Sequence, residues 1–283
     1  MTDSIPVPGG HLAYARAGTG PAVVFLHGGA LDMRMWEQHV PALAVDHTVV
    51  RLDARGHGRS STPAGPFRQC DDVAAAIGAL DLGPAVLVGV SMGAAAAVDT
   101  ALEHPGLVRG IVACSAGASR HAALGQGDFR DPWMLERFAE LDAAARAWDA
   151  AAWIDVYLRA GLVGPYRTVA DVDPRVVARC REMITHTVTT HIRPDSRPPT
   201  PVADAPERIG EITVPLLGVV GTLDSSDHLR MVRELVAGVP GATFAAVDGA
   251  AHLPNIERPA EFDAILRRFL TTRSTPLAGR NSA

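Results

Sequence analysis

Short apolar segments alternate with longer helical segments along most of this sequence, and this alternation is the strongest constraint on the fold. The apolar segments are rich in Val, Leu and Ile and are bounded by Gly, Pro or charged residues, which is typical of buried strands. They lie at residues 22–26, 48–52, 85–90, 108–114, 214–220 and, with more alanine, 242–247. Residues 11–18 predict an antiparallel edge strand, and helices are predicted at 71–80, 92–103, 229–237 and 260–270. This order requires crossover connections, so the sequence predicts an α/β fold with a mostly parallel sheet.

The alternation stops between about residues 118 and 206. This stretch is rich in Ala and Arg and has a helical pattern. It ends in a proline-rich run at 193–206, which predicts an extended segment by which the chain returns to the core. We predict a helical cap at 118–206 above a core formed by residues 1–117 and 207–271. The polar tail at 272–283 is predicted to be loose.

Composition excludes several classes of function. All 26 basic residues are arginine, so catalysis through a lysine Schiff base and a P-loop lysine are both ruled out. The net charge of -5 gives no basis for binding nucleic acid or an anionic membrane. Three widely spaced cysteines without a CxxC motif, no signal-peptide pattern and no apolar stretch of membrane-spanning length favour a soluble cytoplasmic protein.

The segment Gly89-Val-Ser91-Met-Gly93 contains the strongest candidate for a nucleophile. It lies where the predicted strand at 85–90 runs directly into the predicted helix at 92–103. A serine at such a turn is strained and exposes its hydroxyl at the top of the sheet, while the flanking glycines permit the close approach of strand and helix. We therefore predict Ser91 as the nucleophile. The alternative is a small-residue turn needed only for packing.

A nucleophilic serine needs a base, because a free hydroxyl reacts poorly at neutral pH. Among the eleven histidines, His252 follows the last predicted strand, in a loop that can reach the crevice above Ser91. Asp224 follows the strand at 214–220 at the same edge of the sheet, and we expect it to orient the imidazole. Asp227 is its nearby competitor, although it is also placed to cap the helix that begins near residue 228.

An oxyanion hole is expected beside this set. One donor is the N–H of Met92, which follows the nucleophile, and the other comes from the loop after the strand at 22–26. In that loop the glycines allow a close approach to substrate, so Gly29 is the expected second donor, with Gly28 and Ala30 as neighbours. The alternative for this loop is a simple tight turn.

The ordered set of motifs resembles the α/β-hydrolase superfamily, and most of all its small bacterial esterase, enol-lactonase and perhydrolase group. The motifs are His27-Gly-Gly29, Asp53-Ala-Arg55-Gly-His-Gly-Arg-Ser60, Gly89-Val-Ser91-Met-Gly93, Gly221-Thr-Leu-Asp224, and His252 followed by Glu257-Arg-Pro259. The resemblance implies an eight-stranded, mostly parallel sheet with the cap inserted after strand 6. It also implies that Asp53 and Arg55 brace loops beneath the site, and that Glu257 and Pro259 begin the final helix.

The cap holds the least diagnostic candidates. Trp133 and Trp153 are predicted to line the substrate pocket together with Gly28, although a helical tryptophan is more often plain core. The spacing of Cys180, His186 and His191 fits no usual metal site, so we expect no metal there and a solvated helix face instead.

The function predicted from these residues is hydrolysis of a small-to-medium carboxylic ester or lactone through an acyl-enzyme on Ser91, with no cofactor. Dehalogenases and epoxide hydrolases of this type are disfavoured, because they would carry aspartate at position 91. The alternatives are a C–C bond hydrolase, a perhydrolase, a non-hydrolytic cyclase or lyase on the same triad, and a small-molecule receptor on the same fold. The sequence leaves the oligomeric state open.

Overall fold

A computed structural model describes residues 2–118, 129–192 and 198–272. It contains one eight-stranded sheet with the strand order β1-β2-β4-β3-β5-β6-β7-β8. Strands β1 and β2 pair antiparallel, β2 pairs antiparallel with β4, and all further pairs are parallel. The strands are β1 (Asp3–Val7), β2 (Gly10–Ala17), β3 (Ala22–Leu26), β4 (Thr48–Leu52), β5 (Ala85–Val90), β6 (Val108–Cys114), β7 (Leu216–Gly221) and β8 (Thr243–Val247).

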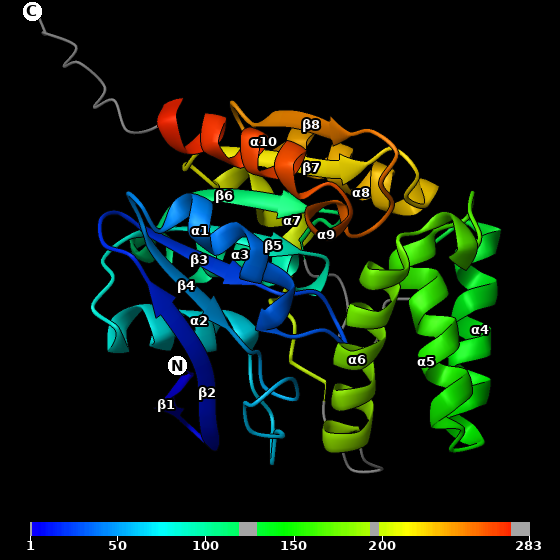
Figure 1. Cartoon of the computed structure of the whole chain (residues 1–283). Coiled ribbons are helices and arrows are strands. Elements are labelled where there is room, and N and C mark those ends of the chain that lie inside the picture. Colours follow the sequence, from blue (N-terminus) through cyan, green and yellow to red (C-terminus); the bar gives the residue numbers. More distant parts are fainter. Residues whose placement is uncertain (1, 119–128, 193–197, 273–283) are drawn as a thin grey trace, which may run out of the picture.

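Both faces of the sheet are covered, which explains why the central strands are apolar at every position. All residues of β3 and β5 are buried. Alternate residues of these strands belong to two separate core clusters, one on each face: Val23 and Phe25 pack toward one side, and Val24 and Leu26 toward the other. The first cluster includes residues of α10, and the second includes residues of α2 and α3 (Figure 1).

The helices of the core fill the connections between strands. Helix α3 begins directly at the end of β5, so this junction is a single turn without a linker. The core elements outside the sheet are η1 (Met33–His39), α1 (Val40–Leu43), α2 (Gln69–Ala79), α3 (Met92–Glu103), η2 (Pro105–Leu107), α7 (Ala205–Arg208), η6 (Ile209–Glu211), α8 (Ser226–Gly238), α9 (Pro254–Glu257) and α10 (Pro259–Thr272).

A helical segment is inserted between β6 and β7. Figure 1 shows its main helices beyond the carboxyl ends of the parallel strands. The segment contains α4 (Pro132–Arg146), α5 (Ala150–Leu158), the π-helical turn η4 (Arg159–Val163), η5 (Val169–Asp171) and α6 (Pro174–His191). The segment therefore lies where ligands of open α/β sheets bind.

The predicted fold class is confirmed, with one correction at the edge of the sheet. The predicted edge strand at 11–18 is β2, which pairs on both sides, while the true edge strand is β1. β1 escaped prediction because most of its residues are exposed and it contains Pro6, a residue that edge strands tolerate because the missing N–H need not be paired. The predicted loose tail, apart from Thr272, and residues 193–197 of the proline-rich run lie outside the described residues. No helix in the described ranges is both long and apolar enough to cross a membrane.

Candidate active site

Ser91 occupies the turn between β5 and α3 in a strained backbone conformation. Its φ of 53° and ψ of -117° place a non-glycine residue at positive φ, which is costly and concentrates at functional sites. A Cβ on Gly89 would lie 2.2 Å from the carbonyl carbon of Gly93, and a Cβ on Gly93 would lie 2.3 Å from the oxygen of Leu26. Only glycine fits at these two positions, as the close approach of strand and helix requires.

Asp224 and His252 meet in front of the carboxyl ends of β7 and β8. His252 lies in the loop after β8, and its Nδ1 donates to Oδ2 of Asp224 across 3.0 Å. The other carboxylate oxygen, Oδ1, accepts the backbone N–H of Ser225 at 2.8 Å. Both side chains are buried. Because the carboxylate fixes the proton on Nδ1, the Nε2 atom of His252 is left as an acceptor.

Ser91 and His252 line one cavity together. It has a volume of about 10 Å³, which is room for about one water molecule. Its walls come from the loop after β3, the loop after β8, and helices α5 and α6. The lining residues are Gly28, Gly29, Leu31, Ser91, Tyr157, Leu158, Gly161, Leu162, Cys180, Ile184, His252 and Leu253.

The electrostatic environment favours a charged aspartate beside a neutral histidine. Burial alone would raise the pKa of Asp224, but the imidazoles of His228 and His252 hold the pKa of this carboxyl well below its usual range. Burial lowers the pKa of His252 and His228 lowers it further, against the opposing effects of Asp224 and Glu257. A neutral imidazole is the form that a general base needs.

Within the described residues, the N–H of Gly29 in the loop after β3 donates no hydrogen bond to the protein. The oxygen of Gly28 accepts Leu31 N–H at 3.2 Å and His27 Nδ1–H at 2.8 Å. The peptide between Gly28 and Gly29 is planar and trans, so the N–H of Gly29 points away from the side on which the Gly28 oxygen accepts these bonds. Ala30 N–H instead donates to His57 Nε2 at 3.1 Å, so Ala30 is already engaged and Gly29 is the better donor candidate.

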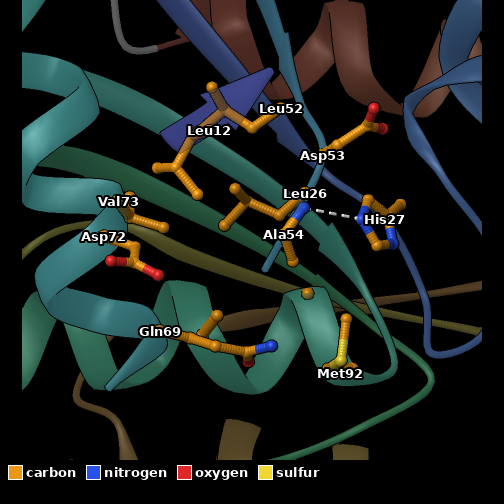
Figure 2. A pocket seen from close by; sticks show the side chains of 12 residues that line it. Leu12, Leu26, His27, Leu52, Asp53, Ala54, Gln69, Asp72, Val73 and Met92 are labelled. Atoms are coloured by element: carbon orange, nitrogen blue, oxygen red, sulfur yellow. Dashed lines mark hydrogen bonds between the residues drawn. The ribbon is translucent and has the colours of Figure 1, made fainter. Parts of the chain in front are cut away.

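Met92 is the first residue of α3, so its N–H has no partner within the helix. A second cavity of about 30 Å³ lies against the side chain of Met92 (Figure 2). It is mostly apolar and has room for about two waters, and neither Ser91 nor His252 lines it. In Figure 2 the Nε2 of His27 accepts the N–H of Ala54 at 2.9 Å, so His27 carries its proton on Nδ1 and braces the loop.

The segment from Asp53 to Ser60 acts as a brace, as the resemblance implied. Asp53 accepts Met33 N–H at 2.7 Å and Arg59 N–H at 2.9 Å. Arg55 forms a buried ion pair with Asp72, with Nε 2.7 Å from Oδ2. None of these groups lines the cavity at Ser91, so their contribution is to hold loops.

The two predicted pocket tryptophans do not line the cavity that contains Ser91. Trp133 packs on the small cluster around Phe138, and Trp153 stacks on Tyr157 with ring centroids 4.9 Å apart. Tyr157 itself reaches the cavity, where its hydroxyl donates to the oxygen of Gly29 at 2.6 Å. The helical pattern marked the segment as apolar, but it did not distinguish Tyr157 from its neighbour one turn away.

The predicted solvated face of α6 is wrong. Cys180 is fully buried and lines the cavity at Ser91. His186 and His191 each bind the oxygen of Gly58 through Nε2, at 2.9 and 3.0 Å. These side chains therefore hold α6 against the core, and the three residues do not converge into a metal-binding group.

Two further sequence expectations are corrected near Asp224 and His252. The cap of α8 is Ser225, whereas Asp227 accepts the N–H groups of residues 130 and 131 and pairs with Arg230. Glu257 ends α9 and does not begin the final helix, which starts at Pro259. Its carboxylate accepts Ala251 N–H at 2.8 Å and forms a buried ion pair with Arg167.

Asp224, His228 and His252 form one of two groups of potential metal ligands in the described part of the chain; the other is Cys70, Asp71 and His104. In the first group the nitrogen atoms nearest the carboxylate already donate hydrogen bonds to it. In the second group, Asp71 is bound by His104 and by Arg68. In both groups the carboxylate is therefore already engaged by hydrogen bonds.

Comparison with known proteins identifies the family. The model of the "Alpha/beta hydrolase family" matches residues 23–265, so the chain belongs to this family. The chain is 28% identical to pyrrolizixenacetamide deacetylase of Xenorhabdus hominickii, with 97% of the chain and 100% of that protein covered. It is 24% identical to 3-oxoadipate enol-lactonase 2 of Acinetobacter baylyi, with 91% and 94% covered.

Two solved structures are similar over nearly the whole chain. The enol-lactonase from Burkholderia xenovorans LB400 superposes with a TM-score of 0.75 at 26% identity, covering 95% of this chain and 100% of that one. Est816, described as an N-acyl homoserine lactone degrading enzyme, superposes with a TM-score of 0.73 at 27% identity, covering 94% and 100%. Together with the family match, these relatives support a hydrolase activity.

Proposed function

We propose that this protein is a serine hydrolase that cleaves a small-to-medium carboxylic ester or lactone through an acyl-enzyme on Ser91. The observation that carries the proposal is the shared cavity: Ser91 and His252 line it together, and His252 is bonded to Asp224 behind it. A base within reach of a nucleophile, and itself oriented by a third group, is the arrangement that activates a hydroxyl. The family membership supports the same chemistry.

In the proposed mechanism, Ser91 Oγ attacks the substrate carbonyl carbon while Nε2 of His252 takes the hydroxyl proton. The resulting oxyanion is held by the N–H groups of Gly29 and Met92. His252 then gives its proton to the leaving oxygen as the C–O bond breaks. Water, deprotonated by the same nitrogen, attacks the acyl carbon, and the acid is released as Ser91 regains its proton. Asp224 offsets the positive charge on His252 in both steps.

The cavity walls support an uncharged, largely apolar acyl group. No described lining residue is charged at neutral pH, because burial lowers the pKa of His252, raises that of Tyr157 and raises that of Cys180 to about 12. The similarity to two enol-lactonases and to the lactone-degrading Est816 supports a lactone or a related ester as the substrate class. We infer that helices α4 to α6 form a cap, since Tyr157 of α5 and Ile184 of α6 roof the cavity.

Ser91→Ala tests the proposal. On p-nitrophenyl acetate and butyrate and on simple γ-lactones, turnover should fall by about 10⁶-fold. A fluorophosphonate probe should label the wild-type protein at Ser91, as read by peptide mass spectrometry. Ser115→Ala is the matched control, because Ser115 is likewise a serine at positive φ just past a strand of this sheet, but it does not line the cavity. Near wild-type turnover in Ser91→Ala would refute the mechanism, and folded protein without probe labelling would favour a receptor.

A further inference from the structure

Asp224 accepts hydrogen bonds from two imidazoles, and the mechanism uses only one of them. His252 Nδ1 lies 3.0 Å from Oδ2, and His228 Nδ1 lies 2.8 Å from Oδ1. The two rings are in contact, with centroids 4.1 Å apart and planes inclined by 37°. Asp224 is 2% exposed, and the two histidines are 7% exposed each. The three groups therefore form one buried electrostatic unit.

His228 is held rigidly in this unit by its surroundings. It lies in the first turn of α8, where Ser225 caps the helix, and the hydroxyl of Ser225 is 2.9 Å from the same Nδ1 atom. The ring of Phe129 packs edge-on against it, with centroids 5.5 Å apart. A carboxylate oxygen only accepts, so Nδ1 of His228 must carry a proton. With the N–H of Ser225, it gives Oδ1 two donors, which fixes the plane of the carboxylate.

Two imidazoles in contact beside one carboxylate cannot both be protonated without strong repulsion. A donor on Oδ1 also withdraws negative charge from Asp224, so the carboxylate stabilises a proton on His252 less strongly. Both effects act in the same direction: His228 weakens the binding of a proton to His252. A single Asp–His pair lacks this opposing group.

Other ionisable groups facing the unit do not duplicate this effect. Glu257 of α9 faces His252 and favours its protonated form, and its own charge is paired with Arg167. Cys114 of β6 faces Asp224 and remains a neutral thiol, because burial raises its pKa.

Beside His228, the carboxylate of Asp227 is bound to Arg230 and to two backbone N–H groups, from residues 130 and 131. His228 is therefore the one described residue that faces His252 and opposes its protonation.

We propose that His228 is a positioning residue for the relay formed by Ser91, His252 and Asp224. It holds Asp224 in place and keeps His252 unprotonated at a pH where a single Asp–His pair would already have lost its base. The inference rests on the proposed function, since His252 must be the base for it to matter in catalysis. It predicts an esterase or lactonase whose activity persists into mildly acidic solution.

Two substitutions at position 228 separate the effect of the hydrogen bond to Asp224 from the effect of the second imidazole. His228→Asn keeps an N–H donor for Asp224 but removes the second imidazole, and His228→Leu removes both. The acid limb of kcat/KM reports the protonation of the base in the free enzyme. It should move upward by about one pH unit in His228→Leu and by a smaller amount in His228→Asn. The plateau kcat should fall about tenfold in His228→Leu alone.

The control is His104→Asn, which removes a partly exposed histidine that is bonded to Asp71 at 2.9 Å and is not among the groups that act on Asp224 or His252. Its acid limb and plateau should match those of the wild type. A merely structural role of His228 would lower the melting temperature or the plateau in the two His228 variants and leave the acid limb in place, and that result would overturn the proposal.

A second readout does not depend on activity. In Ser91→Ala protein labelled with ¹⁵N-histidine, the ring of His252 should titrate at lower pH than in the Ser91→Ala/His228→Asn double variant. Equal titration in the two proteins would overturn the inference even if the enzyme is inactive on every ester. Loss of the proposed function alone would instead appear as an active Ser91→Ala variant with the titration difference intact.

Discussion

The contact between Tyr157 and Gly29 predicts that Gly29→Ala disables the proposed oxyanion loop through one specific clash. Gly29 does not have a positive φ, so alanine is permitted by the backbone. Its Cβ would lie 2.8 Å from the hydroxyl oxygen of Tyr157, inside the 3.4 Å at which ordinary contact begins. That hydroxyl is also held by its 2.6 Å hydrogen bond to the oxygen of Gly29. The conflict of about 0.6 Å must therefore be absorbed by the loop or by α5.

The size of the effect follows from the tolerance of an oxyanion hole. Catalytic groups must be held within about 0.5 Å of their productive positions, so a shift of this size removes the contribution of the Gly29 N–H. Losing one such donor costs about 10²–10³ in kcat. Tyr157→Phe alone removes a hydrogen bond of about 1 kcal/mol, which corresponds to about a fivefold loss. Since phenylalanine lacks the clashing oxygen, Gly29→Ala/Tyr157→Phe should recover to the level of Tyr157→Phe.

The assay is kcat and KM on a p-nitrophenyl ester for the two single variants and the double variant, with circular dichroism to check folding. Gly78→Ala is the matched control, because a Cβ there meets no heavy atom within 4 Å and Gly78 lies inside α2. It should leave kcat unchanged and stabilise the helix by about 1 kcal/mol. If the double variant is as impaired as the product of the two single effects, the clash with the hydroxyl is not the cause of the loss.

Three further outcomes follow from other contacts. Asp224→Asn should lower kcat by about 10⁴-fold without unfolding the protein, because an amide facing Nδ1 favours the wrong tautomer of the base; a wild-type kcat would remove Asp224 from the mechanism. Arg167→Met should lower the free energy of unfolding by about 3–5 kcal/mol in urea titrations, because it leaves Glu257 buried and unpaired. The exposed pair of Arg146 should cost at most about 1 kcal/mol when Arg146→Met is measured in the same way. Burial raises the pKa of Cys180 to about 12, so its thiol should stay unreactive toward a disulfide reagent at pH 8 and react only after unfolding; rapid reaction in native protein would contradict this.

The features predicted correctly from the sequence are those that local chemistry determines. The strand at 85–90 is apolar at every position because both faces of the sheet are covered. The glycines beside Ser91 are required by backbone contacts within five residues along the chain and with β3. Such constraints leave a recognisable pattern in a short segment. The edge strand β1 left no such pattern, because three of its five residues are exposed and one of these is proline.

The features that escaped prediction are contacts between segments far apart in the chain. Tyr157 reaches Gly29 across 128 residues, and Arg167 reaches Glu257 across 90. Neither partner marks the other in the sequence, since a tyrosine on an apolar helix and an arginine in a loop are ordinary. His228 lies only four residues from Asp224, yet the same spacing fits a histidine on the surface of a helix. It contacts His252 only because the loop after β8 brings that residue against its ring. The electrostatics of the proposed base therefore depend on a junction between β7, α8 and β8 that no single segment encodes.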